Sequence, residues 1–224
     1  MDSLLESLKL WLDPVPRSGP ENMAVDEWLL ESTVDPVLRV YGWSGAWGSL
    51  GCFCCLNQAI ENLPNVGLVR RSTGGGIVDH QNDWTYSLVI PETSELARIR
   101  AMDSYRLIHE RLSLVLSGHF NLVAPASDSA ELGGVCFEKP VAFDVVDGVG
   151  NKVAGAGQRR TKHGLLHQGS VAGRCESSDS IERSKRFSAS LSATCEQVDL
   201  DPPAELIHTK VTAKYGNSAW TQRR

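Results

Sequence analysis

The chain is predicted to be an α+β domain with a central mixed, largely antiparallel sheet flanked by helices. Apolar and polar residues alternate over several short segments, including 37–43 and 84–90, as in half-buried strands. Two longer segments, 18–33 and 98–119, carry apolar residues at helical spacing. Many of the strands are joined by short turns, which favours antiparallel neighbours over a doubly wound parallel sheet.

In the first half of the chain, the sequence predicts one helix followed by four strands. The helix covers residues 18–33, because Ser18 suits an N-cap and Pro20 and Glu21 suit a first turn. The expected strands are 37–43, a short one near 48–54, 66–70, and 84–90, which ends at a proline.

The second half begins with the longest helical pattern, 98–119, whose apolar stripe includes Tyr105, Ile108 and Leu112. A strand is expected to begin at 121–123, and a final helix covers 203–215. The segment 175–190 is rich in serine and charge and is predicted to be a surface segment. The remaining expected strands are 141–146 and 152–154, which form a hairpin, and 165–172.

Length and composition indicate one globular domain, 1–224, with 176–224 as a C-terminal extension packed on it. The net charge of −5 argues against a nucleic-acid binder. No apolar run approaches the ~20 residues that cross a bilayer, so no membrane association is expected. The N-terminus lacks the basic start of a signal peptide, which predicts a cytoplasmic protein.

The six cysteines are expected to be free thiols, because the chain is too long and too poor in cysteine for a disulfide scaffold. Cys52, Cys54 and Cys55 lie close together, but no second cysteine pair or nearby histidine completes four zinc ligands. No metal site is therefore predicted.

The segment Arg70–His80 places two arginines before three consecutive glycines. Glycine lets the backbone approach a ligand closely, and backbone N–H groups of such a loop can point at an anion or a carbonyl oxygen. The spacing is neither that of a P-loop nor that of a dinucleotide fingerprint. The alternative is a glycine-rich bend with solvated arginines.

A second segment, 151–160, places Lys152 before small residues, including Gly155 and Ala156, and is followed by the motif LLHQGSV at 165–171. Small residues let a ligand lie against the strand, and an ammonium group there would stabilise negative charge that develops in acyl transfer. Taken alone, a lysine such as Lys152 is far more commonly a surface lysine at the start of a strand, although the neighbouring Gln158-Arg159-Arg160 weakens that interpretation. Together the two glycine-containing segments predict one pocket for a ligand with an apolar tail.

Three other side chains are candidates for chemistry. Cys136 stands in a glycine-containing loop, where a nearby cation would favour the nucleophilic thiolate; the alternative is a packed thiol. His80 and His167 are candidate bases, hydrogen-bonded core groups or carbonyl contacts, and the residues alone leave these options open.

The motifs RRSTGGGIVDH, NKVAGAGQRR and LLHQGSV, in this order, resemble the catalytic domain shared by lipoate–protein ligases, octanoyltransferases and, more distantly, biotin–protein ligases. The similarity runs from about residue 18 to residue 175, and 20–26 resemble the family's first helix. It implies a single catalytic domain of the biotin/lipoate protein ligase type, with an acyl chain in a tunnel.

The resemblance also implies a set of site residues. Lys152 matches the family lysine that contacts the acyl carbonyl, and Cys136 matches the nucleophile in the Cys-Phe loop of one octanoyltransferase group. The expected substrate-binding residues are Arg70, Arg71, Ser72, Thr73, Gly74, Gly75, Gly76, His80, Gly155, Ala156 and His167.

Members of the family divide between transfer and ligation. Ligases activate lipoate with ATP and Mg²⁺, whereas transferases move octanoyl from acyl carrier protein through a cysteine thioester. The Gly-Val-Cys136-Phe loop and the end of the chain at residue 224, which leaves little room for an accessory domain, favour transfer. The ligases' Arg-Asn-Asp segment is absent, but Phe143-Asp144 resembles the Phe/Tyr-Asp of some ligases and amidotransferases. Gly155-Ala156-Gly157 departs from the commoner Gly-Ser-Ala.

The resemblance thus implies an octanoyl or lipoyl transferase that acts without a cofactor. Acyl carrier protein is the expected donor, and a lysine of a lipoyl domain or of a glycine-cleavage H-type protein is the expected acceptor. Burial of an eight-carbon chain, at ~0.8 kcal/mol per CH₂, would contribute on the order of 5 kcal/mol to recognition. The basic cluster of Arg70, Arg71, Arg159, Arg160 and Lys162 is expected to dock acidic partners.

Two alternative functions stay open on the sequence. The first is an ATP- and Mg²⁺-dependent lipoate–protein ligase, including a shortened one that works with a separate accessory chain. The second is a non-catalytic acyl-binding subunit.

Overall fold

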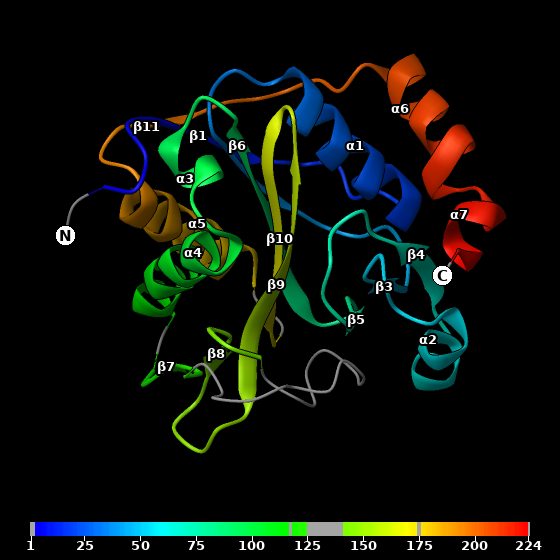
Figure 1. The fold of residues 1–224 in the computed structure, drawn as a ribbon, viewed down its shortest axis with the longest axis horizontal. Helices are drawn as coiled ribbons and strands as arrows, with labels where there is room; N and C mark the ends of the chain where they lie inside the picture. The colour runs from blue at the N-terminus through cyan, green and yellow to red at the C-terminus, as the bar shows by residue number, and fades with distance from the viewer. Residues whose placement is uncertain (1–2, 117, 125–140, 174–175, 224) are drawn as a thin grey trace.

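The computed structural model describes residues 3–116, 118–124, 141–173 and 176–223. Its main feature is an eight-stranded sheet with the order β11-β1-β2-β6-β10-β9-β8-β7 (Figure 1). The strands are β1 (Leu8–Leu12), β2 (Val37–Tyr41), β6 (Asp83–Pro91), β7 (Asn121–Leu122), β8 (Val145–Val146), β9 (Lys152–Thr161), β10 (Gly164–Ala172) and β11 (Cys195–Gln197).

The sheet is mixed. Strand β1 pairs in parallel with β11 and with β2, whereas all pairings from β2 through β6, β10, β9 and β8 to β7 are antiparallel. Long β10 lies between β6 and β9 and places Gly169 opposite both Tyr86 and Ala156. The prediction of a mixed, largely antiparallel sheet is confirmed.

A smaller sheet has the order β4-β3-β5 and carries the glycine-rich segment at one end. Its strands are β3 (Trp47–Leu50), β4 (Gly67–Arg70) and β5 (Ile77–Asp79). Leu50 and Ile77 pack with Ala59 of α2 (Leu56–Asn62), which gives this sheet its own small core. The three glycines therefore form the connection between β4 and β5.

Helices cover both faces of the large sheet (Figure 1). On one face, α4 (Ala101–Val115) and α5 (Ser177–Leu191) pack with α3 (Glu95–Arg98) over the larger core. On the other face, α1 (Gly19–Ser32) packs with α6 (Ala204–Lys210) and the π-helical turn η1 (Val211–Tyr215). The last helix, α7 (Ser218–Gln222), contacts β4.

The predicted first helix is confirmed, and its start follows from local chemistry. Ser18 is the N-cap, and its backbone N–H and hydroxyl both donate to the carboxylate of Glu21, at 2.9 and 2.5 Å. Pro20 occupies the first turn, where no intrahelical N–H partner is needed.

The segment 175–190 was predicted to lie at the surface, and its described residues are mostly exposed, but its helical structure was not predicted. Most of this segment is helix α5, which buries Ser184, Phe187, Ser188 and Leu191 against the sheet. The buried face of this helix is not evident from the sequence, because half of its buried residues are serines. Serine packs closely there because it is small and not because it is hydrophobic. The segment predicted as one helix, 98–119, is interrupted between α3 and α4. Strands β1, β5 and β11 and helix α2 were not predicted.

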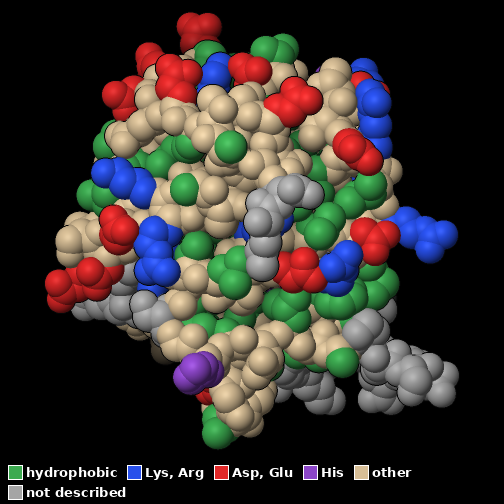
Figure 2. Space-filling view, turned by 90° about the vertical axis from the view of Figure 1, so that its left-hand side faces the viewer, with side chains coloured by type: hydrophobic (Ala, Val, Ile, Leu, Met, Phe, Trp, Pro, Cys, Tyr) green, Lys and Arg blue, Asp and Glu red, His purple; other side chains and the backbone are tan. Residues whose placement is uncertain are grey.

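The surface agrees with the modest net charge. Figure 2 shows one face, where acidic side chains gather near the top and basic side chains lie dispersed. The described atoms of this face form no continuous basic surface of the kind that binds nucleic acid. None of the helices in the described ranges is both long enough and apolar enough to span a bilayer.

The packing of α5 gives a stability prediction. Phe187 is fully buried, with its ring centroid 5.2 Å from that of Tyr86 and 6.2 Å from that of Trp84. Phe187→Ala should therefore lower the free energy of unfolding by about 3–5 kcal/mol. Arg186→Ala, at an exposed position of the same helix, should change it by less than about 0.5 kcal/mol. Urea denaturation of both variants measures this, and equal values would contradict the packing described.

Candidate functional site

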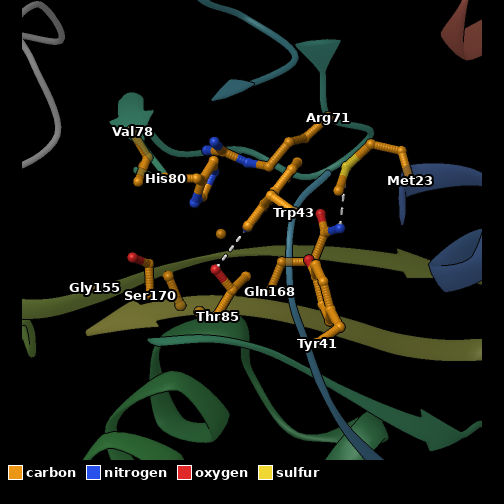
Figure 3. A pocket seen from close by; sticks show the side chains of 13 residues that line it. Met23, Tyr41, Trp43, Arg71, Val78, His80, Thr85, Gly155, Gln168 and Ser170 are labelled. Carbon is orange, nitrogen blue, oxygen red and sulfur yellow. Dashed lines mark hydrogen bonds between the residues drawn. The ribbon is translucent and has the colours of Figure 1, made fainter. Parts of the chain in front are cut away.

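A pocket lies over β9 and β10, on the face of the large sheet that also carries α1. It holds about 390 Å³ of space, its open mouth included. Figure 3 shows Gly155 and Ser170 toward one end and Met23, Gln168 and Tyr41 toward the other. The lining residues are Met23, Tyr41, Trp43, Arg71, Val78, His80, Thr85, Gly155, Ala156, Gly157, Gln168, Gly169 and Ser170.

Aromatic rings and their polar partners form one wall of the pocket. The Trp43 ring stacks on His80, with centroids 4.1 Å apart, and its indole N–H donates to Thr85 Oγ1 at 2.9 Å. His80 is held at both nitrogens, since Nδ1 lies 2.7 Å from Asp83 Oδ2 and Nε2 lies 2.6 Å from Ser49 Oγ. This wall is therefore fixed before any ligand enters.

Arg71 lines the pocket but uses its guanidinium to shape the glycine-rich segment. Its Nη2 donates to the carbonyl oxygens of Gly74 and Gly76, each at 3.1 Å, and its Nη1 donates to Ser49 Oγ. Gly75 between them has φ +90°, a backbone conformation that favours glycine. Arg71 thus stabilises a tight bend at Gly75. A residue other than glycine at position 75 would have a strained backbone there.

The two glycine-containing motifs meet in space. Gly157 of β9 lies so close to the loop that a Cβ there would sit 2.3 Å from the carbonyl oxygen of Gly74, and the Gly74 N–H donates to Gln158 O at 3.4 Å. Absence of a side chain at position 157 therefore permits the loop to pack directly on the strand.

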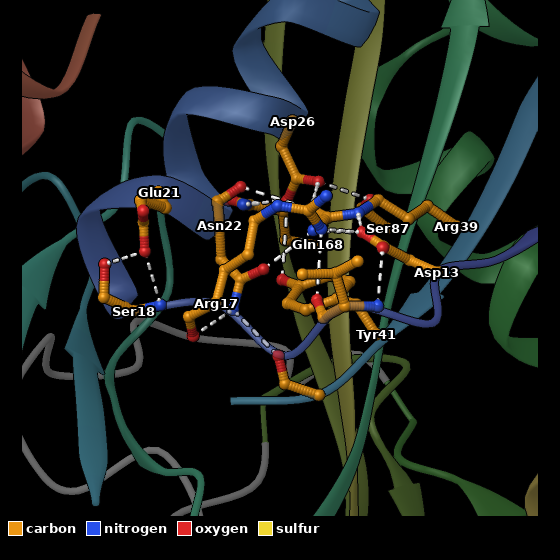
Figure 4. Close-up of polar contacts among 12 residues, drawn as sticks. Asp13, Arg17, Ser18, Glu21, Asn22, Asp26, Arg39, Tyr41, Ser87 and Gln168 are labelled. Atoms are coloured by element: carbon orange, nitrogen blue, oxygen red, sulfur yellow. Dashed lines mark hydrogen bonds and ion pairs between the residues drawn. The ribbon is translucent and has the colours of Figure 1, made fainter. Parts of the chain in front are cut away.

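A buried polar network joins α1 to the centre of the sheet (Figure 4), and it extends from Gln168 to this loop. Arg39 donates to Asp13 at 2.8 Å and to Asp26 at 2.7 Å, and all three side chains are inaccessible to solvent. Asp26 accepts from the amide of Gln168 at 2.7 Å, and Gln168 Oε1 accepts from the Thr73 hydroxyl at 2.7 Å. The network thus links α1, β2 and β10 to the glycine-rich segment.

Lys152 lies at the Gly155 end of the pocket. Its side chain is 2% exposed, and its ammonium forms an ion pair with Asp144 at 2.7 Å. A Cβ at Gly155 would lie 2.6 Å from Lys152 Nζ, so the lysine side chain lies directly across this glycine. The arrangement places a positive charge beside the lining strand, where a carbonyl oxygen of a bound ligand can be polarised.

The predicted substrate-binding residues divide into two groups. Arg71, His80, Gly155 and Ala156 line the pocket. The others lie outside its lining, although Thr73 bonds to the pocket residue Gln168, and a Cβ at Gly75 would lie 3.1 Å from Arg71 Nη2. The residues outside the lining are Arg70, Ser72, Thr73, Gly74, Gly75, Gly76 and His167.

Arg70 differs most from its expected role. It is fully buried and donates to four carbonyl oxygens, those of Gly51, Cys52, Cys54 and Thr221, at 2.8–3.3 Å. It therefore ties β4 to the C-terminal segment. With Arg71 also buried, the prediction that both arginines belong to an exposed docking cluster was wrong.

The rest of that cluster is only partly available. Arg160 donates to Ser104 Oγ at 2.6 Å and to Gln158 at 3.0 Å, whereas Arg159 is half-buried and Lys162 is exposed. Arg159 instead joins Lys214 and Arg223 around a broader cleft beside Ser72 and Gly74. A basic surface thus exists next to the loop, with a different membership from the predicted one.

Two buried histidines lie beneath the pocket, on the face of the sheet that carries α4. Burial lowers the pKa of His109 to about 4, and burial, helped by His109 and Arg160, holds the pKa of His167 well below its usual range. His167 contacts the Tyr86 hydroxyl at 3.2 Å and Gln158 at 3.1 Å. Both rings are neutral near pH 7, which places His167 among hydrogen-bonded core groups.

Cys136 lies outside the described residues. Among the cysteines that the structure describes, Cys52, Cys54 and Cys195 are free thiols. Within the described ranges, no group of three or more His, Cys, Asp or Glu side chains is placed to hold a metal ion.

Comparison with known proteins assigns this architecture. Residues 18–212 match the family described as the lipoyl protein ligase A/B catalytic domain. The chain belongs to this family. The match includes the glycine-rich loop, the Lys152 strand and the pocket between them, and it confirms the resemblance that the three motifs predicted.

Curated relatives of the chain include octanoyltransferases named LipM. The protein from Bacillus subtilis is 34% identical over 167 residues, which are 67% of this chain and 60% of that protein. The protein from Symbiobacterium thermophilum is 35% identical over 179 residues, which are 71% of this chain and 63% of that protein. The aligned part thus spans less than two thirds of the length of these relatives.

Solved structures share the fold at low sequence identity. The putative lipoate protein ligase Ta0514 of T. acidophilum superposes with a TM-score of 0.73 at 19% identity, covering 97% of this chain and 99% of that one. The same protein with bound lipoic acid gives 0.70, covering 98% and 100%. These likenesses confirm the predicted fold class.

Several pocket residues were not predicted from the sequence. Trp43 ends a predicted strand, and Gln168 and Ser170 lie inside the motif LLHQGSV. The segments that hold them were therefore predicted, but the contribution of these three side chains to the pocket was not. Met23 lies within the predicted first helix, but no role in a pocket was predicted for it. Its contribution to the pocket depends on the packing of α1 over β10, which a single sequence does not reveal.

The close contact between loop and strand predicts an asymmetry between two glycines. Gly157→Ala should lower the free energy of unfolding by about 1–3 kcal/mol, because its methyl group would displace the Gly74 carbonyl. Gly74→Ala is the control, because a Cβ there meets nothing within 4 Å. Chemical denaturation distinguishes them, and a tolerated Gly157→Ala would show that the loop does not rest on β9.

The buried histidines predict that stability falls in mild acid. Because the pKa of His109 is near 4 when folded and near 6.5 when unfolded, only the unfolded chain binds a proton between these values. The free energy of unfolding is therefore highest above about pH 6.5 and decreases as the pH falls toward 4. This histidine alone should lower it by about 2 kcal/mol between pH 7 and pH 5.

His109→Gln should weaken this pH dependence, whereas His163→Gln, at an exposed position, should retain it. The measurement is urea denaturation at the two pH values. An unchanged slope in His109→Gln would contradict the role of its burial.

Proposed function

We propose that this chain catalyses acyl transfer in protein lipoylation, as an octanoyltransferase. The observation that carries the proposal is the Lys152 ammonium held across Gly155 at one end of a largely apolar pocket. Membership of the lipoyl protein ligase A/B catalytic domain family and similarity to proteins named octanoyltransferase LipM support it. A buried cation beside an apolar channel suits a fatty acyl thioester better than a polar substrate.

The pocket gives the acyl group a direction. The carbonyl would lie at the Gly155 end, within reach of Lys152, and the alkyl chain would extend toward Met23 and Tyr41 (Figure 3). Each buried CH₂ contributes about 0.8 kcal/mol. The Trp43–His80 wall and the strand glycines would exclude water along the chain.

The proposed reaction has two steps. The Cys136 thiolate attacks the octanoyl thioester carbonyl, the bond to the donor sulfur breaks, and the donor leaves as a thiolate that takes up a proton from water. The amine of an acceptor lysine then attacks the Cys136 thioester and releases the cysteine as the amide forms. Lys152 stabilises the oxyanion in both steps. Because an amide is more stable than a thioester, the scheme needs no ATP, metal or other cofactor.

The donor is proposed to be acyl carrier protein, and the acceptor a lipoyl domain or a glycine-cleavage H-type protein. If these partners are acidic, complementary charge would come from Arg159, Lys214 and Arg223, which surround the cleft beside the glycine-rich loop. The octanoyl group and not the lipoyl group is the proposed cargo, following the names of the curated relatives.

Intact-mass spectrometry tests the proposal. After incubation with octanoyl carrier protein, the wild-type chain should gain one octanoyl group, which hydroxylamine should remove because it cleaves thioesters. Cys136→Ala should gain none. Cys195→Ala, which removes an exposed thiol, should gain it as the wild type does.

Retention of the adduct in Cys136→Ala would overturn the assignment of the nucleophile. Absence of an adduct on the wild type, together with lipoate-dependent exchange between ATP and pyrophosphate, would replace transfer by the ligase reaction.

A further inference from the structure

The ion pair between Lys152 and Asp144 is almost completely shielded from water. The lysine side chain is 2% exposed and the aspartate side chain is inaccessible. A shielded pair holds its geometry only if its remaining hydrogen-bonding positions are satisfied by rigid partners. The groups that hold Asp144 therefore decide where the ammonium lies.

Tyr105 of α4 is the most informative of these groups. Its hydroxyl donates to Asp144 Oδ1 at 2.6 Å and accepts from the backbone N–H of Ala156 at 2.9 Å. The backbone N–H of Val141 donates to Asp144 Oδ2 at 2.8 Å. One phenol thus joins the carboxylate to the strand that lines the pocket and fixes the distance between them.

The backbone next to Asp144 is strained, and the same helix supports it. Phe143 has φ +68°, the only positive value for a non-glycine residue in the described ranges. His109, one turn after Tyr105 on α4, lies with Nδ1 2.7 Å from Phe143 O, and the Phe143 N–H donates to Val123 O at 2.9 Å. Strain of this kind persists only where the surroundings enforce it, and it clusters at functional sites.

We propose that Tyr105 and Asp144 are positioning residues that aim the Lys152 ammonium across Gly155 toward the acyl carbonyl. Neither residue belongs to the pocket lining, so both act through Lys152 and not on the substrate. The inference rests on the proposed function, because it takes Lys152 as the group that polarises the carbonyl.

The first test is Tyr105→Phe, which keeps the ring and removes the hydroxyl. Single-turnover formation of the octanoyl adduct should slow by about 10–100-fold, since a misplaced catalytic group loses orientation, while the KM for octanoyl carrier protein changes little. Ser113→Ala removes a hydroxyl of the same helix that donates to Glu110 O, within α4 itself, and should react at the wild-type rate. A wild-type rate in Tyr105→Phe would overturn its role.

The second test separates positioning from simple structural support. Asp144→Ala should lose most of the rate, and added formate should restore part of it, because formate returns a carboxylate to the vacated space. Formamide, similar in size and neutral, should not. Equal recovery with both compounds, or no recovery in a variant whose circular dichroism and thermal midpoint match the wild type, would overturn the role of Asp144.

The same variants remain informative if the proposed function fails. Should the wild type form no octanoyl adduct but catalyse lipoate-dependent exchange between ATP and pyrophosphate, transfer would be wrong, and the exchange rate of Tyr105→Phe would replace the adduct as the readout. Loss of exchange would support positioning, and full exchange would overturn it. A wild type inactive in both reactions would overturn both proposals.

Discussion

The rest of the site depends on the hydrogen bonds that the buried carboxylate of Asp26 accepts. This carboxylate accepts from Arg39 of β2, Ser87 of β6 and Gln168 of β10, at 2.7–2.8 Å. Three strands and helix α1 are therefore fixed by one side chain. Removal of either partner of such a buried pair leaves an uncompensated charge, which commonly destabilises a protein by about 3–5 kcal/mol. These buried polar contacts thus fix how β2, β6, β10 and α1 are positioned relative to one another, which apolar packing alone would specify less strictly.

Gln168 connects the buried Asp26 to the pocket and to the glycine-rich segment. Its amide N–H₂ is occupied by Asp26 and its carbonyl oxygen by Thr73, so its orientation is determined by hydrogen bonds at both ends. Through Thr73 it fixes the start of the glycine-rich segment, and Arg71 fixes the remainder from inside the bend. The loop is therefore preorganised, although glycine is the most flexible residue type. Its glycines serve close packing on β9 rather than motion.

The strands of the large sheet that carry strong alternation could be predicted from the sequence, as could the two motifs that meet at the pocket. The role of Arg70 could not be predicted, because Arg70 and Arg71 are adjacent in the sequence but bond to different segments, Arg70 to the C-terminal segment and Arg71 to the glycine-rich loop. The helix at 177–191 was missed because serines occupy much of its buried face. Tyr105 was recognised only as part of an apolar stripe, since its hydroxyl partners lie 39 and 51 residues away in the sequence.

The charges around the pocket are arranged so that its Gly155 end differs from its Met23 end. Under the strands, His109 and His167 are kept neutral by burial, which lowers the pKa of each ring, and the Arg71 guanidinium is directed at loop carbonyls. At the Gly155 end, Lys152 is held by a carboxylate in a region nearly free of water. An ammonium in such surroundings interacts strongly with a developing oxyanion, because little solvent screens it. The alkyl chain of the proposed acyl substrate would instead meet aromatic rings and glycine backbone, so the pocket would take a neutral tail and a carbonyl head in one orientation.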